Sequence, residues 1–154
     1  GTKLAEERKS FIENLNLKAE KIHGDISANK ESLKIEYKES VDYSNFYEKM
    51  VKNRDKDIFY GNTCVGIHKD DMVFYINGNN ARDYASQGQQ RTICLSLKMA
   101  EVELINEKTG AYPVLLLDDV LSELDKNRQD YILKSINNIQ TIITCTGLDE
   151  ITRN

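Results

Sequence analysis

The fold of this chain is decided by residues 113–125, which read PVLLLDDVLSELD. A proline opens the continuous apolar run Val114–Leu117, and Asp118 and Asp119 follow it directly. Such a run is typical of a strand that is covered on both faces, as in a parallel sheet. The last side chains of such a strand reach the carboxyl edge of the sheet, where open α/β folds bind their ligands. We therefore expect a binding crevice at the two aspartates.

The segments around this run favour an α/β fold. Residues 126–136 are predicted to form a helix capped by Asp125, and residues 141–144 a second buried strand. A strand, a helix and a strand in this order predict a parallel pair. Farther upstream, the helix that starts at Ser86 has two opposite apolar faces, which predicts a position between two packed layers. One face has Ile93, Leu97, Ala100 and Leu104, and the other has Leu95, Met99 and Val102.

The first 85 residues combine an amphipathic helix with a β-rich section. The helix is expected to end at Gly24, and it either packs on its own domain or ends a longer helical arm. Its apolar residues are Leu4, Phe11, Leu15, Ala19 and Ile22. The pattern then predicts a strand at 33–37, a helix at 43–57, a strand at 63–65, and a strand at 72–76 with a hairpin turn at Asn77-Gly78.

Composition restricts the class of protein only loosely. The net charge of -4 argues against a surface that is positive throughout, so any contact with nucleic acid must be confined to one region. The three cysteines are widely spaced and form no CxxC pair, which is typical of a reduced, cytoplasmic chain without a zinc site. No apolar run approaches the roughly 18 to 20 residues of a membrane span.

The two aspartates and the start of the two-faced helix form the candidate site. Mg²⁺ prefers oxygen ligands, so one carboxylate with nucleotide phosphates suits it, while the second carboxylate orients or deprotonates a water. Residues 86–91, SQGQQR, offer backbone N–H groups, a hydroxyl and the positive end of a helix dipole, which together form an anion site. Alternatively, the aspartates begin an exposed loop and Ser86 is only an N-cap.

These segments, in this order, resemble the signature segment, Walker B strand and D-loop of the ABC-type ATPases. Their sequences look like those of the RecF family of recombinational-repair proteins, which is related to the SMC class. The matching segments are SQGQQRT at 86–92, LSLKMAE at 95–101 and LLLDDVLSELD at 115–125. Residues 66–71, GIHKDD, match that family's Gly-Pro-His-Arg-Asp-Asp segment, with Ile67 and Lys69 as departures. The resemblance covers most of residues 58–146, and it implies the C-terminal half of an ABC-type ATPase head.

The resemblance implies a role for each matched acidic residue. Asp118 would hold Mg²⁺, and Asp119 would take the place of the catalytic glutamate of most ABC ATPases. The D-loop would comprise Ser122, Leu124 and Asp125, and would lie across a dimer interface near the second site.

The resemblance also implies a nucleotide contact in trans. Ser86 and Gly88 would reach the γ-phosphate of a nucleotide bound to the opposite subunit, and Gln89 and Gln90 would shape that turn. Gln87 would belong to the same nucleotide-binding segment. Thr146 stands where ABC proteins usually offer a switch histidine. His68 is either a functional residue of the matched 66–71 segment or a structural one. His23 is interpreted as a favourable charge at a helix C-terminus.

A phosphate-binding loop is missing from this sequence. No glycine is followed by lysine, so G-x-x-x-x-G-K-[ST] is absent, and in the family this loop belongs to the N-terminal portion. We therefore expect residues 1–57 to form the end of a helical arm with a connecting strand and helix. Residues 58–154 would form the C-terminal part of the ATPase head, inactive alone and without a tightly bound cofactor.

For a full-length parent, the resemblance implies a DNA-dependent ATPase of DNA repair, recombination, replication and the SOS response. It would use ATP and Mg²⁺, dimerise on ATP, bind DNA at gaps or strand junctions, and help partner proteins to load a recombinase. The alternative is a non-enzymatic DNA- or protein-docking module with a vestigial ATP site. A head of the SMC type would need a far longer coiled coil upstream.

Overall fold

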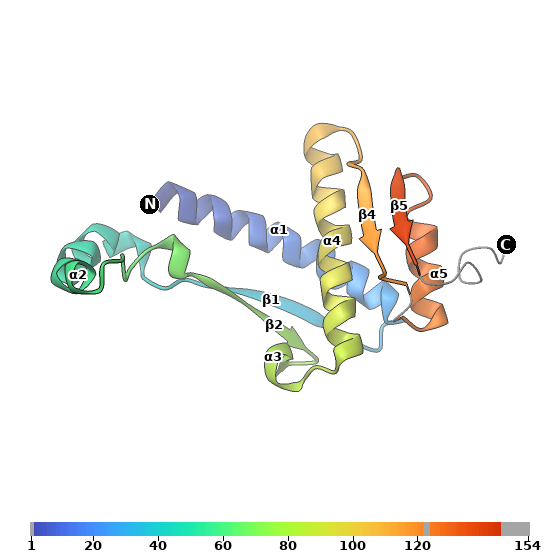
Figure 1. The fold of residues 1–154 in the computed structure, drawn as a ribbon, viewed down its shortest axis with the longest axis horizontal. Coiled ribbons are helices and arrows are strands. Elements are labelled where there is room, and N and C mark those ends of the chain that lie inside the picture. Colours follow the sequence, from blue (N-terminus) through green and yellow to red (C-terminus); the bar gives the residue numbers. More distant parts are fainter. Residues whose placement is uncertain (1, 122–123, 146–154) are drawn as a thin grey trace.

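A computed structural model describes residues 2–121 and 124–145 (Figure 1). Its helices are α1 (Thr2–Ile26), α2 (Phe46–Tyr60), α3 (Ala81–Tyr84), α4 (Gln87–Thr109) and α5 (Lys126–Ser135), with short 3-10 helices η1 (Tyr43–Asn45) and η2 (Ile67–Lys69). Its strands are β1 (Leu33–Lys38), β2 (Asp71–Ile76), β3 (Asn79–Asn80), β4 (Leu115–Asp118) and β5 (Thr141–Thr144). None of the helices in these residues has the length and hydropathy to cross a membrane.

The strands form two separate sheets. β1, β2 and β3 form an antiparallel sheet that extends away from the remaining strands (Figure 1). β4 and β5 pair in parallel, as predicted, with α5 connecting them. Their register places Asp118 opposite Thr144.

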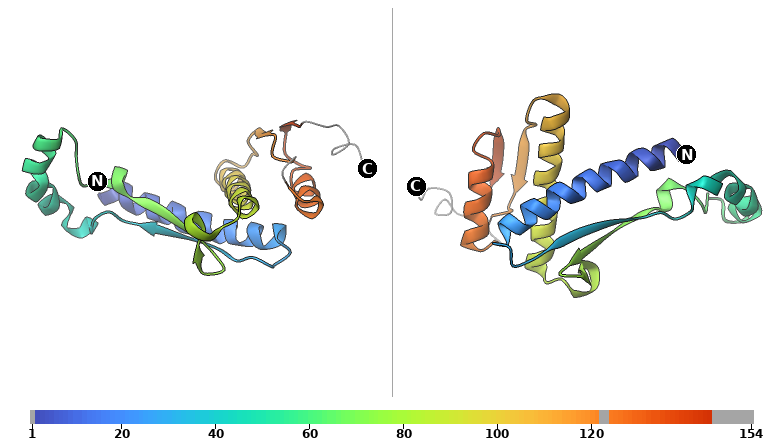
Figure 2. Two further views of the ribbon diagram at one scale, coloured as in Figure 1. Left: turned by 60° about the horizontal axis from the view of Figure 1, so that its bottom comes forward. Right: turned by 180° about the vertical axis from the view of Figure 1, so that it is seen from behind.

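α4 lies between two groups of buried side chains, as its two apolar faces predicted. One face packs with β4, α5 and the end of α1, and the other packs with α1, β1 and β2. Figure 2 shows α1 crossing α4, with the two parallel strands beside α4. Ser86 caps α4 at its start, and Gly110 ends it in the left-handed conformation at φ 75°. Because α4 contacts both groups, it connects the antiparallel sheet of β1, β2 and β3 to the parallel strands β4 and β5.

Among the described residues, the strand predicted at 114–117 is not covered on both faces, and the strand predicted at 141–144 is not buried. Leu115 and Leu117 are buried against α4 and α5, whereas Leu116 is 69% exposed and Ile142 of β5 is 57% exposed. The described helices cover one face of the strand pair only. An apolar face of the sheet therefore remains open to solvent.

The prediction for the first helix is partly wrong. α1 continues through Gly24 to Ile26, and the chain reverses only where Ala28 and Asn29 adopt positive φ. The buried face is also rotated from the predicted one, because Leu4 and Phe11 are exposed. The buried residues of α1 are Ala5, Ile12, Leu15, Ala19, His23 and Ile26.

The strand predicted at 63–65 does not form. The Cys64 N–H donates to Asp57 Oδ1 at 2.8 Å, and the Thr63 carbonyl accepts from His68 Nε2 at 2.8 Å, so side chains satisfy these backbone groups in place of a neighbouring strand. The hairpin turn at Asn77-Gly78 is confirmed, with positive φ at both residues.

Candidate functional site

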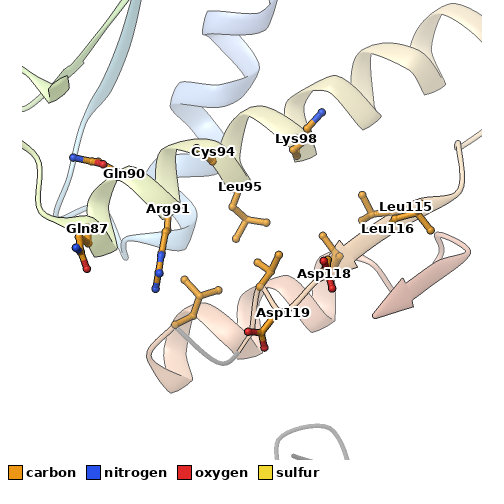
Figure 3. A pocket seen from close by; sticks show the side chains of 13 residues that line it. Gln87, Gln90, Arg91, Cys94, Leu95, Lys98, Leu115, Leu116, Asp118 and Asp119 are labelled. Carbon is orange, nitrogen blue, oxygen red and sulfur yellow. The ribbon is translucent and has the colours of Figure 1, made fainter. Parts of the chain in front are cut away.

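A cleft of about 580 Å³ separates the first half of α4 from β4 (Figure 3). α4 contributes Gln87, Gln90 and Arg91 to its lining, and Asp118 and Asp119 lie at the carboxyl end of β4. Both aspartates are exposed. The crevice predicted at the strand end is therefore present, and part of the signature segment lies across it.

Asp118 is oriented by the neighbouring strand. The Thr144 hydroxyl donates a hydrogen bond to Asp118 Oδ1, because the parallel register places the two residues side by side. One carboxylate oxygen thus has a fixed partner, and the carboxylate remains exposed at the cleft. A carboxylate held in this way is suited to bind a cation.

Asp119 has an unusual backbone conformation. Its φ is 50°, in the left-handed region that aspartate and asparagine tolerate better than most residues. Its N–H donates to the Thr144 carbonyl at 3.1 Å and to the Thr144 hydroxyl at 3.0 Å. The turn after β4 is therefore held by β5, and strained backbone of this kind is often found at functional sites.

The signature segment begins with a capping box. Ser86 Oγ accepts from the Gln89 N–H at 3.2 Å, and Gln89 Oε1 accepts from the Ser86 N–H at 2.9 Å. Gln90 Nε2 donates to the Ala85 carbonyl at 3.1 Å. Ser86 is therefore an N-cap, and the capping box fixes the turn that precedes α4.

The described residues of the D-loop are held by hydrogen bonds, with Leu124 buried and Asp125 exposed. Leu124 is buried, and Gln129 Nε2 donates to the carbonyls of Leu121 at 2.7 Å and Leu124 at 3.2 Å. Asp125 caps α5 by accepting from the Arg128 N–H at 3.1 Å. The other D-loop candidate, Ser122, and the switch candidate, Thr146, lie outside the described residues.

The acidic residues fit a metal only together with further ligands. Among residues 2–121 and 124–145, no group of three or more His, Cys, Asp or Glu side chains is arranged to hold an ion. Asp118 and Asp119 supply oxygen ligands from one edge of the sheet. Because Mg²⁺ commonly takes one or two carboxylates and completes its shell with phosphate oxygens and water, this donor set fits Mg²⁺ bound with a nucleotide.

His23 lies in the last turn of α1, as expected, but burial there disfavours the charge that was inferred for it. Its side chain is fully buried, with Nδ1 3.1 Å from Ser96 Oγ and Nε2 3.2 Å from Glu31 Oε2. Burial lowers the pKa of His23, although Glu31 acts in the opposite direction. The error arose because α1 continues past Gly24 and places His23 against α4.

The 66–71 segment lies at the end of the paired strands β1 and β2 that is far from this cleft (Figure 1). Within it, Asp70 accepts hydrogen bonds from the hydroxyls of Tyr37 and Tyr43 and from the Ser40 N–H. Burial raises the pKa of Asp70, but these hydrogen bonds outweigh burial and lower the pKa to about 2. Asp70 is therefore a structural anchor, and His68 is exposed beside it.

The Asp70→Asn variant is expected to have a lower free energy of unfolding than wild type, by an amount that depends on pH. The carboxylate stabilises the fold fully above its ordinary pKa of 3.8, and the contribution disappears as the pH falls towards about 2. Denaturant unfolding of the full-length protein should therefore show a loss of about 1–2 kcal/mol in the variant at pH 7 and a smaller difference at pH 3. Asp71→Asn removes a neighbouring carboxylate without the tyrosine contacts and serves as the control. An equal difference at both pH values would contradict this assignment.

Two contributors to the site had weak signals in the sequence. Thr144 contacts both aspartates, and the parallel pairing of the predicted strands, aligned at their ends, would have identified it. Gln129 lies one turn into the helix after the D-loop, and only its side-chain contacts reveal its role.

Curated proteins related to this chain share one description. The "DNA replication and repair protein RecF" of Lachnospira eligens is 50% identical over 154 residues, which is 100% of this chain and 42% of that protein. The protein of the same description from Lachnoclostridium phytofermentans is 50% identical over 154 residues, or 43% of its length. A scan against protein-family models finds no match.

Solved structures share the fold. "Structure of the recombination mediator protein RecF-ATPrS in RecFOR pathway" matches with a TM-score of 0.81 at 38% identity, over 97% of this chain and 43% of that one. The corresponding RecF-ATP structure matches with a TM-score of 0.80, also at 38% identity, over 97% of this chain and 44% of that one. The predicted α/β fold of an ATPase head is confirmed, and the chain spans about two fifths of the length of these relatives.

Proposed function

Because this chain is related to the RecF proteins along its whole length, we propose that it is the C-terminal part of a RecF-type DNA-repair ATPase. The full-length protein binds ATP and DNA and dimerises when ATP is bound. It then helps partner proteins to load a recombinase at single-strand gaps. The protein acts in the cytoplasm.

The observation that carries this proposal is the aspartate pair at the cleft. Asp118 would hold Mg²⁺, which would supply positive charge next to the phosphates, and Asp119 would orient and deprotonate the attacking water. Thr144 supports this division of roles, because it contacts the carboxylate of Asp118 but the backbone of Asp119.

Ser86–Gln90 and the D-loop act on the second subunit in this proposal. The capping box presents the turn before α4 at a helix N-terminus, which favours a phosphate group. Dimerisation then requires that ATP bind the closed state preferentially. Hydrolysis removes the γ-phosphate and releases the dimer.

The open face of β4 and β5 supports an incomplete ATP site. Leu116 of β4 and Ile142 of β5 expose apolar side chains, as does Val114 just before β4, although exposed apolar patches are normally covered. In the proposal, the portion of the head that carries the phosphate-binding loop covers this face.

A docking module is the second candidate, and α2 favours it. Within the described structure, none of the α2 residues is buried, and several large apolar side chains are exposed along it. They are Tyr47, Met50, Val51, Ile58, Phe59 and Tyr60. A full-length sequence with G-x-x-x-x-G-K-[ST] after a strand would favour the ATPase, and one without it the docking module.

Calorimetry with ATP and Mg²⁺ tests the proposal directly. The 154-residue chain is expected to show no measurable ATP affinity, because it contains no phosphate-binding loop. The full-length protein is expected to bind ATP with an affinity in the range of roughly 1 μM to 1 mM. Micromolar binding by the 154-residue chain, or no binding by the full-length protein, would overturn the proposal.

A further inference from the structure

A group of polar side chains lies directly behind the signature segment. Arg128 of α5 and Glu31 of the α1–β1 connection are 18% and 14% exposed, and Arg128 Nη2 lies 3.5 Å from Glu31 Oε1. The other members of the group come from α1 and α4. The group therefore joins three parts of the chain that are far apart in sequence.

Arg128 links the D-loop to the signature helix. Its Nε lies 3.2 Å from Asp125 Oδ2, and its Nη1 donates to Thr92 Oγ1 at 2.8 Å and to the Gly88 carbonyl at 3.4 Å. Thr92 Oγ1 in turn donates to the Gly88 carbonyl at 2.8 Å. One planar guanidinium thus fixes the position of Gly88 relative to Asp125. Lysine cannot reproduce this forked geometry.

Glu31 holds the capping glutamine from the other side. Its Oε1 accepts from Gln89 Nε2 at 3.2 Å, and its Oε2 lies 3.2 Å from His23 Nε2. The Glu31 N–H donates to Ser27 Oγ at 3.3 Å, which secures its backbone. Glu31 therefore contacts the signature segment, the D-loop arginine and the buried histidine at once.

Two contacts of the Gln89 side chain, with Ser86 and with Glu31, determine which residue types suit position 89. Gln89 accepts a hydrogen bond from the Ser86 N–H through Oε1 and donates one to Glu31 through Nε2. Glutamate at this position of a capping box would serve the first contact equally well. It would fail at the second, because two carboxylates would then face each other in a half-buried site. The contact with Glu31 thus requires an amide at position 89.

We propose that Arg128 and Glu31 are positioning residues that fix the signature turn and the D-loop of one subunit at a set spacing. The inference rests on the proposed function, in which both segments meet the nucleotide site of a second subunit. Two contact points on one rigid unit must match two points on the partner, so an error in their spacing weakens dimerisation. ATP binding by the monomer depends on neither segment.

The test uses the full-length protein and swaps the carboxylate of Glu31 and the amide of Gln89 between the two positions. Gln89→Glu keeps the capping box and places a carboxylate against Glu31, whereas the double variant Glu31→Gln, Gln89→Glu restores one amide and one carboxylate. Glu101→Gln, on an exposed part of α4, is the matched control for the loss of a charge. Sedimentation with ATP measures dimerisation, calorimetry measures ATP affinity, and melting temperatures report on the fold.

Gln89→Glu is expected to weaken ATP-dependent dimerisation by about tenfold or more, within the usual range of coupling between sites. ATP affinity of the monomer should stay unchanged, and the double variant should recover most of the dimerisation. Arg128→Lys should weaken dimerisation in the same way, because it loses the forked contacts. Glu101→Gln should behave as wild type.

Two outcomes would overturn the positioning role alone. One is wild-type dimerisation by Gln89→Glu, and the other is a double variant as weak as the single variant although both have the wild-type melting temperature. A wild-type protein that fails to dimerise with ATP would instead overturn both this inference and the proposed function.

Discussion

The Asp119→Asn variant of the full-length protein is expected to bind ATP and to dimerise, but to hydrolyse ATP about a hundredfold to ten-thousandfold more slowly. The change removes a carboxylate that can accept a proton and keeps the size of the side chain. It also preserves the backbone, because asparagine tolerates the left-handed conformation that Asp119 adopts at φ 50°. The hydrogen bonds from the N–H of residue 119 to Thr144 are therefore retained.

Asp118→Asn separates the two roles. If Asp118 holds Mg²⁺, this variant should lose affinity for ATP with Mg²⁺, whereas Asp119→Asn should retain it. Calorimetry and single-turnover hydrolysis at saturating ATP distinguish the two variants. Turnover by Asp119→Asn at the wild-type rate would remove Asp119 from the role of base.

The sequence predicted the elements around the site because the signals there are local. The apolar run before Asp118, the serine before α4 and the aspartate before α5 each lie next to the structure that they specify. A cap and a strand end depend on neighbouring residues only. For this reason the parallel strand pair and the two-faced helix were predicted with their correct types.

The contacts behind the site could not be predicted, because they join distant residues. Glu31 and Gln89 are 58 positions apart, and His23 and Ser96 are 73 positions apart. No local pattern distinguishes a buried histidine at a helix end from an exposed one. The strand predicted at 63–65 failed for a different reason, because nearby side chains, Asp57 and His68, bond its backbone groups in place of a neighbouring strand.

The exposed face of the strand pair shows a different limit of prediction from sequence. Residues Val114–Leu117 predicted a strand that is covered on both faces, but the described residues cover only one face. A sequence pattern records the environment in the whole protein, whereas the structure of this chain contains only the layers that the chain itself supplies. The chain spans about two fifths of the length of its relatives, and in the proposed function the portion that carries the phosphate-binding loop supplies the second layer.

The Ser86→Arg variant of the full-length protein is expected to bind ATP as a monomer but to show no ATP-dependent dimerisation. Ser86 is exposed at the start of α4, so a large side chain fits there without a clash inside the subunit. On the proposed dimer, the same side chain occupies the space of the γ-phosphate of the opposite nucleotide. Sedimentation with and without ATP measures the effect.

The loss of the N-cap must be separated from the loss of the contact in trans. Arginine has no side-chain oxygen to accept the Gln89 N–H, and removing such a cap typically costs about 1 kcal/mol. Ser86→Gly also removes the hydroxyl but adds no bulk, and glycine at an N-cap costs only a few tenths of a kcal/mol relative to serine. Ser86→Gly should therefore dimerise with ATP more weakly than wild type but measurably. Dimerisation of Ser86→Arg at the wild-type level would show that the signature segment does not act across subunits, because the longer side chain fills the space that the proposed γ-phosphate contact needs.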